Sequence, residues 1–443
     1  MIEIGTHEFE INPKIGQPMG GYWRYNKFIK GIRDPVFGNI LIISNKKLTY
    51  ELVVLDELIL DSQLVKEMKQ EIEKRTKIPY KNITIHVNHT HSTSVTVPEP
   101  SDDDYPFLLP EAWDVHEMRK LTRERRETLV KIVSAASEIA FRQMNPVRVG
   151  YKEGYTEDIG RNRNRPLDGP VDNSVPVIRF ESTVGNPPVI LANFGTHPTI
   201  APPENCLISG DLVGSTRKTV KNLMGSQTKF LYTTGAAGDV STRFTRKDSS
   251  FAEVERMGRI LGSEIVKTAE RITNFEEDIN LNAKYEPIEL PVRKLPSLNE
   301  ANKIFERVKQ ELEEAQKKKK DHGLIKKLTE NLEGASVQKR FAALNEDEKL
   351  AFSKEKFRVP LQAVRIGDIK LIFHPFELFS EIALNIKARR PKSVIIGYSN
   401  NWLSYIPTQY AFDESSYETY ITLATPGAYK TFEAALLHLL DKV

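Results

Sequence analysis

Residues 37–60 read FGNILIISNKKLTYELVVLDELIL, and they indicate the architecture of the first half of the chain. Two runs rich in aliphatic and β-branched residues flank a polar break at Ser44–Lys47, a pattern that predicts a β-hairpin. The next segment, 62–76, has its apolar residues at helical spacing. A strand pair followed by an amphipathic helix predicts a sheet with a helix packed on one face.

The segment NITIHVNHTHS, residues 82–92, alternates apolar and polar side chains. Alternate residues of a strand point to the same face, so Ile85 and Val87 share a face with His89 and His91 if the strand continues that far. The alternation therefore predicts a strand that presents two imidazoles on one side.

Strands and helices alternate along the rest of the chain. A second hairpin is predicted from 176–180 with 188–194. Helical spacing occurs at 118–143, 211–224, 252–274 and 376–389, and strand-like runs occur at 147–151, 228–235, 359–373 and 393–398. Hairpins mixed with βα units predict an α/β (α+β) fold, with mixed β-sheets flanked by helices in one large domain spanning 1–443.

The region 297–357 differs from its surroundings. It is strongly charged, with EEAQKKKKDHGLIKK at its centre, and it contains almost no aromatic residues. We predict two solvent-exposed helices joined near Asp321–Gly323, forming a helical insertion within the domain rather than part of its core.

Composition restricts the function classes. The formal net charge is +3, from 63 basic and 60 acidic residues, and this balance gives no general attraction to nucleic acid. The one cysteine, Cys206, excludes an intramolecular disulfide and a cysteine-based zinc site. The N-terminus lacks the pattern of a signal peptide, and no apolar run reaches the roughly 20 residues of a membrane span. We expect a cytoplasmic protein without stable membrane insertion; the sequence assigns no oligomeric state.

The segment 93–117 is long, acidic and rich in proline. Long loops of this kind are often functional, for example as lids. Its large apolar side chains are Tyr105, Phe107, Leu108, Leu109 and Trp113. Two interpretations are equally favoured: a cover over an amphiphilic substrate, or a surface loop that packs its own aromatic residues.

The strongest chemical signal is NHTHS at 88–92. A His-x-His pair at a strand end can bring two imidazoles to one cavity, and neutral imidazole is a good ligand for zinc. The alternative is a pair of polar residues that cap a strand. His197, in NFGTHPT after the apolar run PVILA, is a candidate third nitrogen ligand, because α/β proteins gather their sites at strand ends.

Three further residues are candidates. Ser241 lies in TGAAGDVSTR, where small residues after a strand allow a close backbone approach, so it is either a nucleophile, an oxyanion donor or part of an ordinary turn. Glu377 follows the strand-like run LIFH and is either a carboxylate ligand or an acid in the first turn of a helix. Tyr405 either packs in the core or turns its phenol into the site. No G-x-S-x-G motif supports a serine-hydrolase triad.

Taken together and in this order, these segments resemble the neutral/alkaline ceramidase family. The residues that carry the resemblance are INP and GQPMGGY at 11–22, NHTHS at 88–92, THPT at 196–199, ISGDLVG at 208–214, GAAGDVS at 235–241, PFELF at 375–379 and SNNWLSYIPT at 399–408. The resemblance covers nearly all of 4–294 and 358–425.

The resemblance implies a site. Transferred by position, the zinc (Zn2+) ligands of the family fall on His89, His197, Glu377 and Tyr405, and its essential serine falls on Ser241. His91 would lie beside the metal and bind substrate or move protons. The active-site arginine would be Arg163, with Arg165 as the alternative.

The resemblance also implies an activity: zinc-dependent hydrolysis of the amide bond of an N-acyl amine or a related small amphiphilic amide, as in sphingolipid metabolism. Zinc-activated water would attack the carbonyl, while Arg163 and Tyr405 stabilise the oxyanion and His91 protonates the leaving amine. A His/His/Glu/Tyr set also accepts iron or manganese.

Two other interpretations remain open. Ser92-Thr93-Ser94-Val95 replaces the family's HSGPGGY continuation, and Arg243 stands two residues after Ser241. These differences favour a hydrolase of a small polar amide, ester or cyclic amide on the same scaffold. The other alternative is a zinc-stabilised or metal-free binding protein without turnover, with 297–357 as its partner surface.

Overall fold

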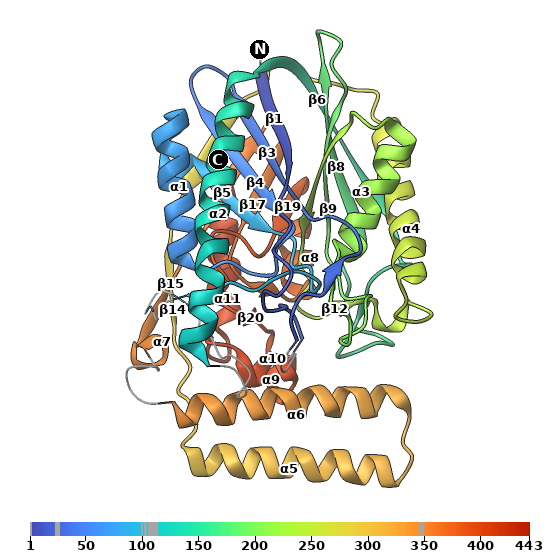
Figure 1. Ribbon diagram of the computed structural model, residues 1–443, viewed down its shortest axis with the longest axis vertical. Coiled ribbons are helices and arrows are strands. Elements are labelled where there is room, and N and C mark those ends of the chain that lie inside the picture. The colour runs from blue at the N-terminus through green and yellow to red at the C-terminus, as the bar shows by residue number, and fades with distance from the viewer. Residues whose placement is uncertain (1, 23–26, 99–100, 102–103, 105–113, 345–349) are drawn as a thin grey trace.

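The computed structural model describes residues 2–22, 27–98, 101, 104, 114–344 and 350–443 (Figure 1). Its largest sheet has eight strands in the order β11-β9-β8-β6-β1-β3-β4-β5. In chain order these are β1 (Ile2–Glu10), β3 (Phe37–Ser44), β4 (Thr49–Leu55), β5 (Ile83–Val87), β6 (Asn145–Tyr155), β8 (Ser174–Ser182), β9 (Val189–Phe194) and β11 (Lys229–Thr234). The outermost pairs, β4 with β5 and β9 with β11, are parallel, and the pairs between them are antiparallel.

A second sheet has four strands in the order β13-β16-β17-β19. They are β13 (Leu281–Tyr285), β16 (Gln362–Ile366), β17 (Ile369–Phe373) and β19 (Ser393–Ile396). Four short pairs complete the strands: β2 (Gly31–Ile32) with β10 (Leu207–Ile208), β7 (Arg161–Asn162) with β12 (Val240–Ser241), β14 (Ile288–Pro291) with β15 (Lys356–Val359), and β18 (Glu377–Leu378) with β20 (Tyr405–Ile406). Parallel and antiparallel pairs occur in both large sheets, so the predicted mixed-sheet α/β fold is confirmed.

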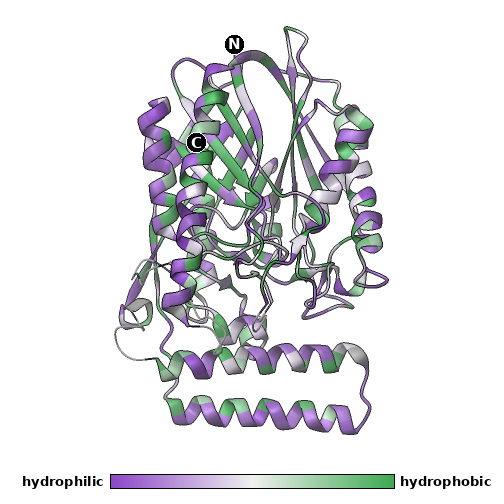
Figure 2. Ribbon diagram, viewed as in Figure 1, coloured by the Kyte–Doolittle hydropathy of each residue, from purple (hydrophilic) through white to green (hydrophobic). Residues whose placement is uncertain are grey.

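Apolar side chains on both faces of the strands lead to four layers, which are two sheets and the helices on their outer faces. In β3, Ile40 and Ile42 pack with helix residues, whereas Leu41 and Ile43 on the opposite face pack with Leu371 and other residues of the second sheet. The helix-covered face is shared by α1 (Ser62–Thr76) and α2 (Val115–Arg142) over one half and by α3 (Asp211–Met224) and α4 (Phe251–Glu270) over the other. The outer face of the second sheet is covered by α8 (Ser380–Arg389) and α11 (Ala428–Asp441). The two sheets therefore form the inner layers (Figures 1 and 2).

One glycine fixes how closely a helix approaches the sheet. A Cβ on Gly5 in β1 would collide with the carbonyl oxygen of Ala140 in α2. The absence of a side chain at this position allows α2 to lie directly on the strand.

Both predicted hairpins are confirmed as β3–β4 and β8–β9. The prediction that the strand after residue 82 continues through His91 is wrong, because β5 ends at Val87. The chain leaves the strand direction there, since the N–H of Asn88 bonds to Leu55 O and the N–H of His89 bonds to Glu57 O. His89 takes a left-handed backbone conformation with φ 65°. The imidazoles of His89 and His91 therefore meet through a turn and not through strand parity.

Residues 297–357 contain an antiparallel helix pair, α5 (Leu298–Lys317) and α6 (His322–Ala343), followed in the described residues by the short helix α7 (Leu350–Ser353). The pair lies across one end of the molecule next to α9 (Gln409–Asp413) and α10 (Tyr417–Ile421), and α6 contacts α10 (Figure 1). The expectation of two solvent-exposed helices outside the core is wrong. Val308 of α5 and Ala335, Val337 and Phe341 of α6 are buried in the same apolar cluster as Phe376. The periodic apolar residues are too few to stand out against the lysines and glutamates around them.

The segment 93–117, interpreted equally as a substrate cover or as a surface loop, lies largely outside the described residues. Its Tyr105, Phe107, Leu108, Leu109 and Trp113 all fall within 105–113. In the part of the chain that the structure describes, no helix combines the length and the hydropathy of a membrane span.

Truncating Phe341 tests whether α6 belongs to the core. Phe341 is 0% exposed, so Phe341→Ala is expected to lower the free energy of unfolding by about 3–5 kcal/mol, through lost transfer energy and the cavity it leaves. Urea denaturation measures the change. Leu324→Ala on the same helix is the control, because Leu324 is 37% exposed and its truncation should cost far less. Equal effects of the two substitutions would show that α6 is not part of the core.

Candidate metal centre

The candidate site lies where strands of both sheets end. His89 follows β5, His197 follows β9, Ser241 lies beyond β11, and Glu377 follows β17. A buried histidine, His86, ties these ends together: its Nδ1–H donates to Gly397 O at 2.9 Å and its Nε2 accepts from the N–H of Thr234 at 3.1 Å. The segments that follow the strands therefore converge on one buried position.

His89 is fixed on two sides. Its Nδ1 lies 2.8 Å from Leu58 O, and since a carbonyl only accepts, Nδ1 carries the proton. Its ring stacks on Tyr398 with centroids 4.4 Å apart. Burial lowers the pKa of His89 to about 4, against the opposing charge of Glu377. The ring is thus neutral, with the lone pair of Nε2 facing the site.

His197 is held in the same manner from another strand. Its Nδ1–H donates to Val240 O at 3.0 Å, which turns Nε2 toward the site. Both Nε2 atoms face one carboxylate oxygen, Oε2 of Glu377, at 2.9 Å from His197 and 3.6 Å from His89.

Glu377 is the anionic centre of this cluster. Its side chain is 2% exposed, and burial by itself would raise its pKa. The facing imidazoles of His89 and His197 and the Arg163 guanidinium outweigh burial and lower the pKa to about 2, so the carboxylate is ionised. The Tyr398 phenol also contacts Oε2, at 3.3 Å, and Trp402 Nε1–H donates to Oε1 at 3.1 Å.

His91 joins the cluster in a different role. Its Nε2 lies 3.2 Å from Nε2 of His89, and ring nitrogens of His89, His91 and His197 all lie within 4.8 Å of one another, a spacing that could hold a metal ion. The N–H of Tyr22 points at Nδ1 of His91 at 3.3 Å, which makes Nδ1 the acceptor and places the proton on Nε2. In this tautomer His91 donates a hydrogen bond toward the site, whereas a ligand would need an Nε2 lone pair.

Tyr405 and Arg163 form the next part of the site. Strands β18 and β20 are parallel with Glu377 opposite Tyr405, and the Tyr405 hydroxyl lies 3.1 Å from the Arg163 guanidinium. Burial and the charge of Glu377 raise the pKa of Tyr405, although Arg163 opposes this. Arg163 also bonds to Glu418 at 2.8 Å. Arg165 instead pairs with Asp168 away from this cluster.

Ser241 lies beside His197, since the two residues form a parallel β-bridge. Its Oγ accepts from the N–H of Arg243 at 3.4 Å, and Ser241 is 3% exposed. The loop is anchored by Asp239, whose carboxylate accepts from the side chain of Asn162 and from the N–H and hydroxyl of Ser380. Burial raises the pKa of Asp239 to about 7.

The donor set fits a metal ion. Two imidazoles turn Nε2 toward the site with Nδ1 bonded to backbone carbonyls, and an ionised carboxylate lies between them. Sequence reasoning missed Tyr398, Trp402 and Glu418. Tyr398 and Trp402 precede Tyr405 in the aromatic-rich segment 397–408, so the sequence offered a signal for them, but nothing in the sequence marked Glu418.

A scan against protein-family models and a search of curated proteins each found no match. Among solved structures, a neutral ceramidase from Pseudomonas aeruginosa aligns with a TM-score of 0.74 and 17% identity, over 100% of this chain and 75% of that one. A ceramidase complexed with C2 aligns with a TM-score of 0.74 and 16% identity, over 99% of this chain and 74% of that one.

The chain has the fold of neutral ceramidase. The resemblance inferred from short motifs is thus confirmed at the level of the fold. The neutral ceramidase fold covers the chain from end to end, so α5 and α6 lie within the aligned length.

Metal content tests the centre directly. We expect about one zinc per chain in the wild-type protein, because structural and catalytic zinc sites bind a single ion tightly. His89→Ala and His197→Ala should lose it, and elemental mass spectrometry measures the result. His438→Ala, at an exposed histidine of α11, is the matched control and should retain the metal.

His91→Ala tests whether His91 is a metal ligand. The tautomer argued above predicts that this variant keeps its zinc. A loss as complete as that of His197→Ala would show that the site uses three imidazoles.

Proposed function

We propose that the protein is a zinc-dependent hydrolase that cleaves the amide bond of an N-acyl amine or a related small amphiphilic amide. The observation that carries the proposal is the buried, ionised Glu377 between two imidazoles whose Nδ1 atoms are bonded to carbonyls. The fold shared with two ceramidase structures supports the same reaction class.

His89, His197, Glu377 and Tyr405 would hold the metal. Zinc would act as a Lewis acid toward the amide carbonyl and would lower the pKa of a bound water to about 7. Tyr398 and Trp402 would orient Glu377 through the contacts that they make with its two carboxylate oxygens. Iron or manganese would suit the same donors.

Arg163 would stabilise the negative charge that develops on the carbonyl oxygen. Burial by itself would lower its pKa, but Tyr405 and Glu418 beside it raise the pKa well above its usual value, so the guanidinium stays charged. Glu418 bonds to Nε and the Tyr405 hydroxyl contacts one terminal nitrogen, which fixes the plane of the guanidinium. A preorganised cation of this kind needs no rearrangement during the reaction.

His91 and Ser241 would handle the proton and the substrate. His91 is half-buried beside His89 and would deliver a proton from Nε2 to the leaving amine. Ser241 would hydrogen-bond the substrate next to His197, and direct attack by its hydroxyl is the alternative.

A second candidate substrate class follows from Arg243. Two residues after Ser241, it forms a two-pronged ion pair with Glu330 of the insertion, with one N–O distance of 2.7 Å. Charged groups next to the serine favour a small polar amide or ester over a long-chain lipid.

A substrate panel distinguishes the two classes. We expect zinc-loaded protein to release amine from N-acyl amines, with kcat/KM rising with acyl chain length if the substrate is amphiphilic. Chromatography of the products measures this against short polar amides, esters and cyclic amides. Preference for the polar set would support the second class. No turnover of any member by zinc-loaded protein would contradict hydrolysis and favour a binding role.

Arg163→Lys tests the oxyanion assignment on whichever substrate is cleaved. Lysine keeps the charge opposite Glu418 but cannot bond to Glu418 and Tyr405 together, so kcat should fall by on the order of 10²-fold with zinc content unchanged. Arg165→Lys is the matched control two residues away and should change kcat little. Equal kcat values for the two variants would remove Arg163 from the proposed mechanism.

A further inference from the structure

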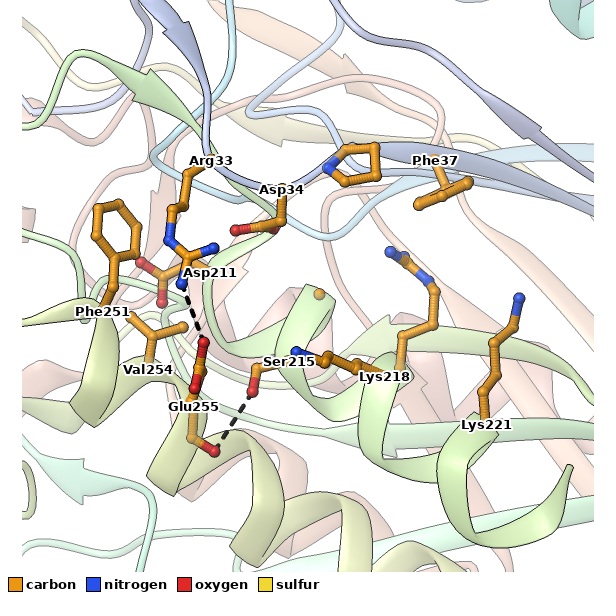
Figure 3. A pocket seen from close by; sticks show the side chains of 13 residues that line it. Arg33, Asp34, Phe37, Asp211, Ser215, Lys218, Lys221, Phe251, Val254 and Glu255 are labelled. Atoms are coloured by element: carbon orange, nitrogen blue, oxygen red, sulfur yellow. Dashed lines mark hydrogen bonds and ion pairs between the residues drawn. The ribbon is translucent and has the colours of Figure 1, made fainter. Parts of the chain in front are cut away.

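A second cavity lies away from the metal centre, between the first turns of α3 and α4 and the chain that leads into β3 (Figure 3). Its volume is about 260 Å³, slightly below the range of typical small-molecule sites, so its ligand would be small. None of the residues proposed for the metal centre lines it.

The walls of this cavity are largely apolar. Pro35, Phe37, Phe251 and Val254 contribute to the lining from three different segments. The Arg33 guanidinium lies over the ring of Phe251, with 5.5 Å between Cζ and the ring centroid. A ligand here would need an apolar body.

The acidic residues at the cavity already have partners. Asp34 accepts from the Ser209 hydroxyl and from the N–H of Gly210. Asp211 accepts three backbone N–H groups, from Ile200, Ala201 and Leu212. Glu255 pairs with Arg33 at 3.0 Å.

Arg217 differs from these residues. Its side chain is 6% exposed, and its guanidinium lies 5.1 Å from the centroid of the Phe37 ring. One nitrogen donates to Asp56 at 2.7 Å, but within the described part of the chain the buried Nε–H has no acceptor. An unpaired buried donor on a charged group is costly, which makes an additional acceptor at this position favourable.

A second cation is available nearby. Lys218 is exposed at the cavity, and no ion pair or hydrogen bond to its ammonium occurs among the described residues. Lys221, one turn further along α3, is paired with Glu8. The charged group at the cavity that lacks an ion pair is therefore a cation, the Lys218 ammonium, and it lies beside an apolar wall.

We propose that this cavity binds a small amphipathic anion, a carboxylate with a short aliphatic or aromatic body. The carboxylate would accept from Arg217 and Lys218, and its body would pack on Phe37, Phe251 and Val254. Guanidinium groups suit carboxylates because they donate two parallel hydrogen bonds. This site does not depend on the proposed hydrolase activity.

Isothermal titration calorimetry with hexanoate and benzoate tests the proposal on the full-length protein. Both should bind at one site per chain, whereas hexan-1-ol and acetate, which each lack half of the required chemistry, should bind at least about tenfold more weakly. Absence of saturable binding by hexanoate and benzoate would overturn the proposal.

Variants locate the site. Lys218→Glu is the main variant, because Lys218 is exposed and has no structural partner to lose; it should weaken hexanoate binding at least about tenfold. Arg217→Lys is the second variant. It keeps a positive charge opposite Asp56 but removes the guanidinium that donates two parallel hydrogen bonds. Lys66→Glu, at an exposed lysine of α1, is the matched control and should bind as the wild type does.

His197→Ala separates this cavity from the metal centre, where a carboxylate product would also bind. Undiminished binding by His197→Ala together with weakened binding by Lys218→Glu supports the proposal. Loss of binding in His197→Ala, or equal affinities in the wild type, Lys218→Glu and Arg217→Lys, would place the carboxylate elsewhere.

Discussion

The arrangement of the strand ends depends on two hydrogen bonds made by one side chain, the neutral imidazole of His86. Burial lowers its pKa to about 3, so it keeps one donor and one acceptor and uses both, toward Gly397 and Thr234. These two bonds join the ends of β5 and β11 in the large sheet to the end of β19 in the small one. The residues that follow those strands bring His89, the Ser241 loop and Tyr398 to one place.

The second constraint is electrostatic. An ionised carboxylate at the position of Glu377 is stable only because cationic and dipolar groups surround it, and two of these groups are the imidazoles that would bind a metal. The same residues therefore satisfy a buried charge and form a donor set. The orientation of the two imidazoles is fixed by hydrogen bonds to the carbonyls of Leu58 and Val240 and by the stacked ring of Tyr398.

Helix α6 contributes to this arrangement. Gly334 lets α6 approach the ring of Tyr417, and Tyr417 packs edge-on against Tyr405 with centroids 6.0 Å apart. Glu330 on the same helix pairs with Arg243 beside Ser241. A segment with the composition of a solvated surface thus supports two parts of the candidate site.

The sequence by itself determined the elements and the donor types. Alternation in 37–60 and helical spacing in 62–76 are local patterns, so they predicted the first hairpin and the helix after it, and the histidines, glutamate and tyrosine stood in recognisable motifs. Only the tertiary structure decided which of them meet. The strand ends at Val87, so a left-handed turn at His89 replaces strand parity, and the Arg163 side chain is 10% exposed whereas that of Arg165 is 33% exposed. Glu418 reaches Arg163 across 255 residues of chain. Contacts between residues so far apart in the sequence depend on how the layers pack, and local sequence patterns do not predict that packing.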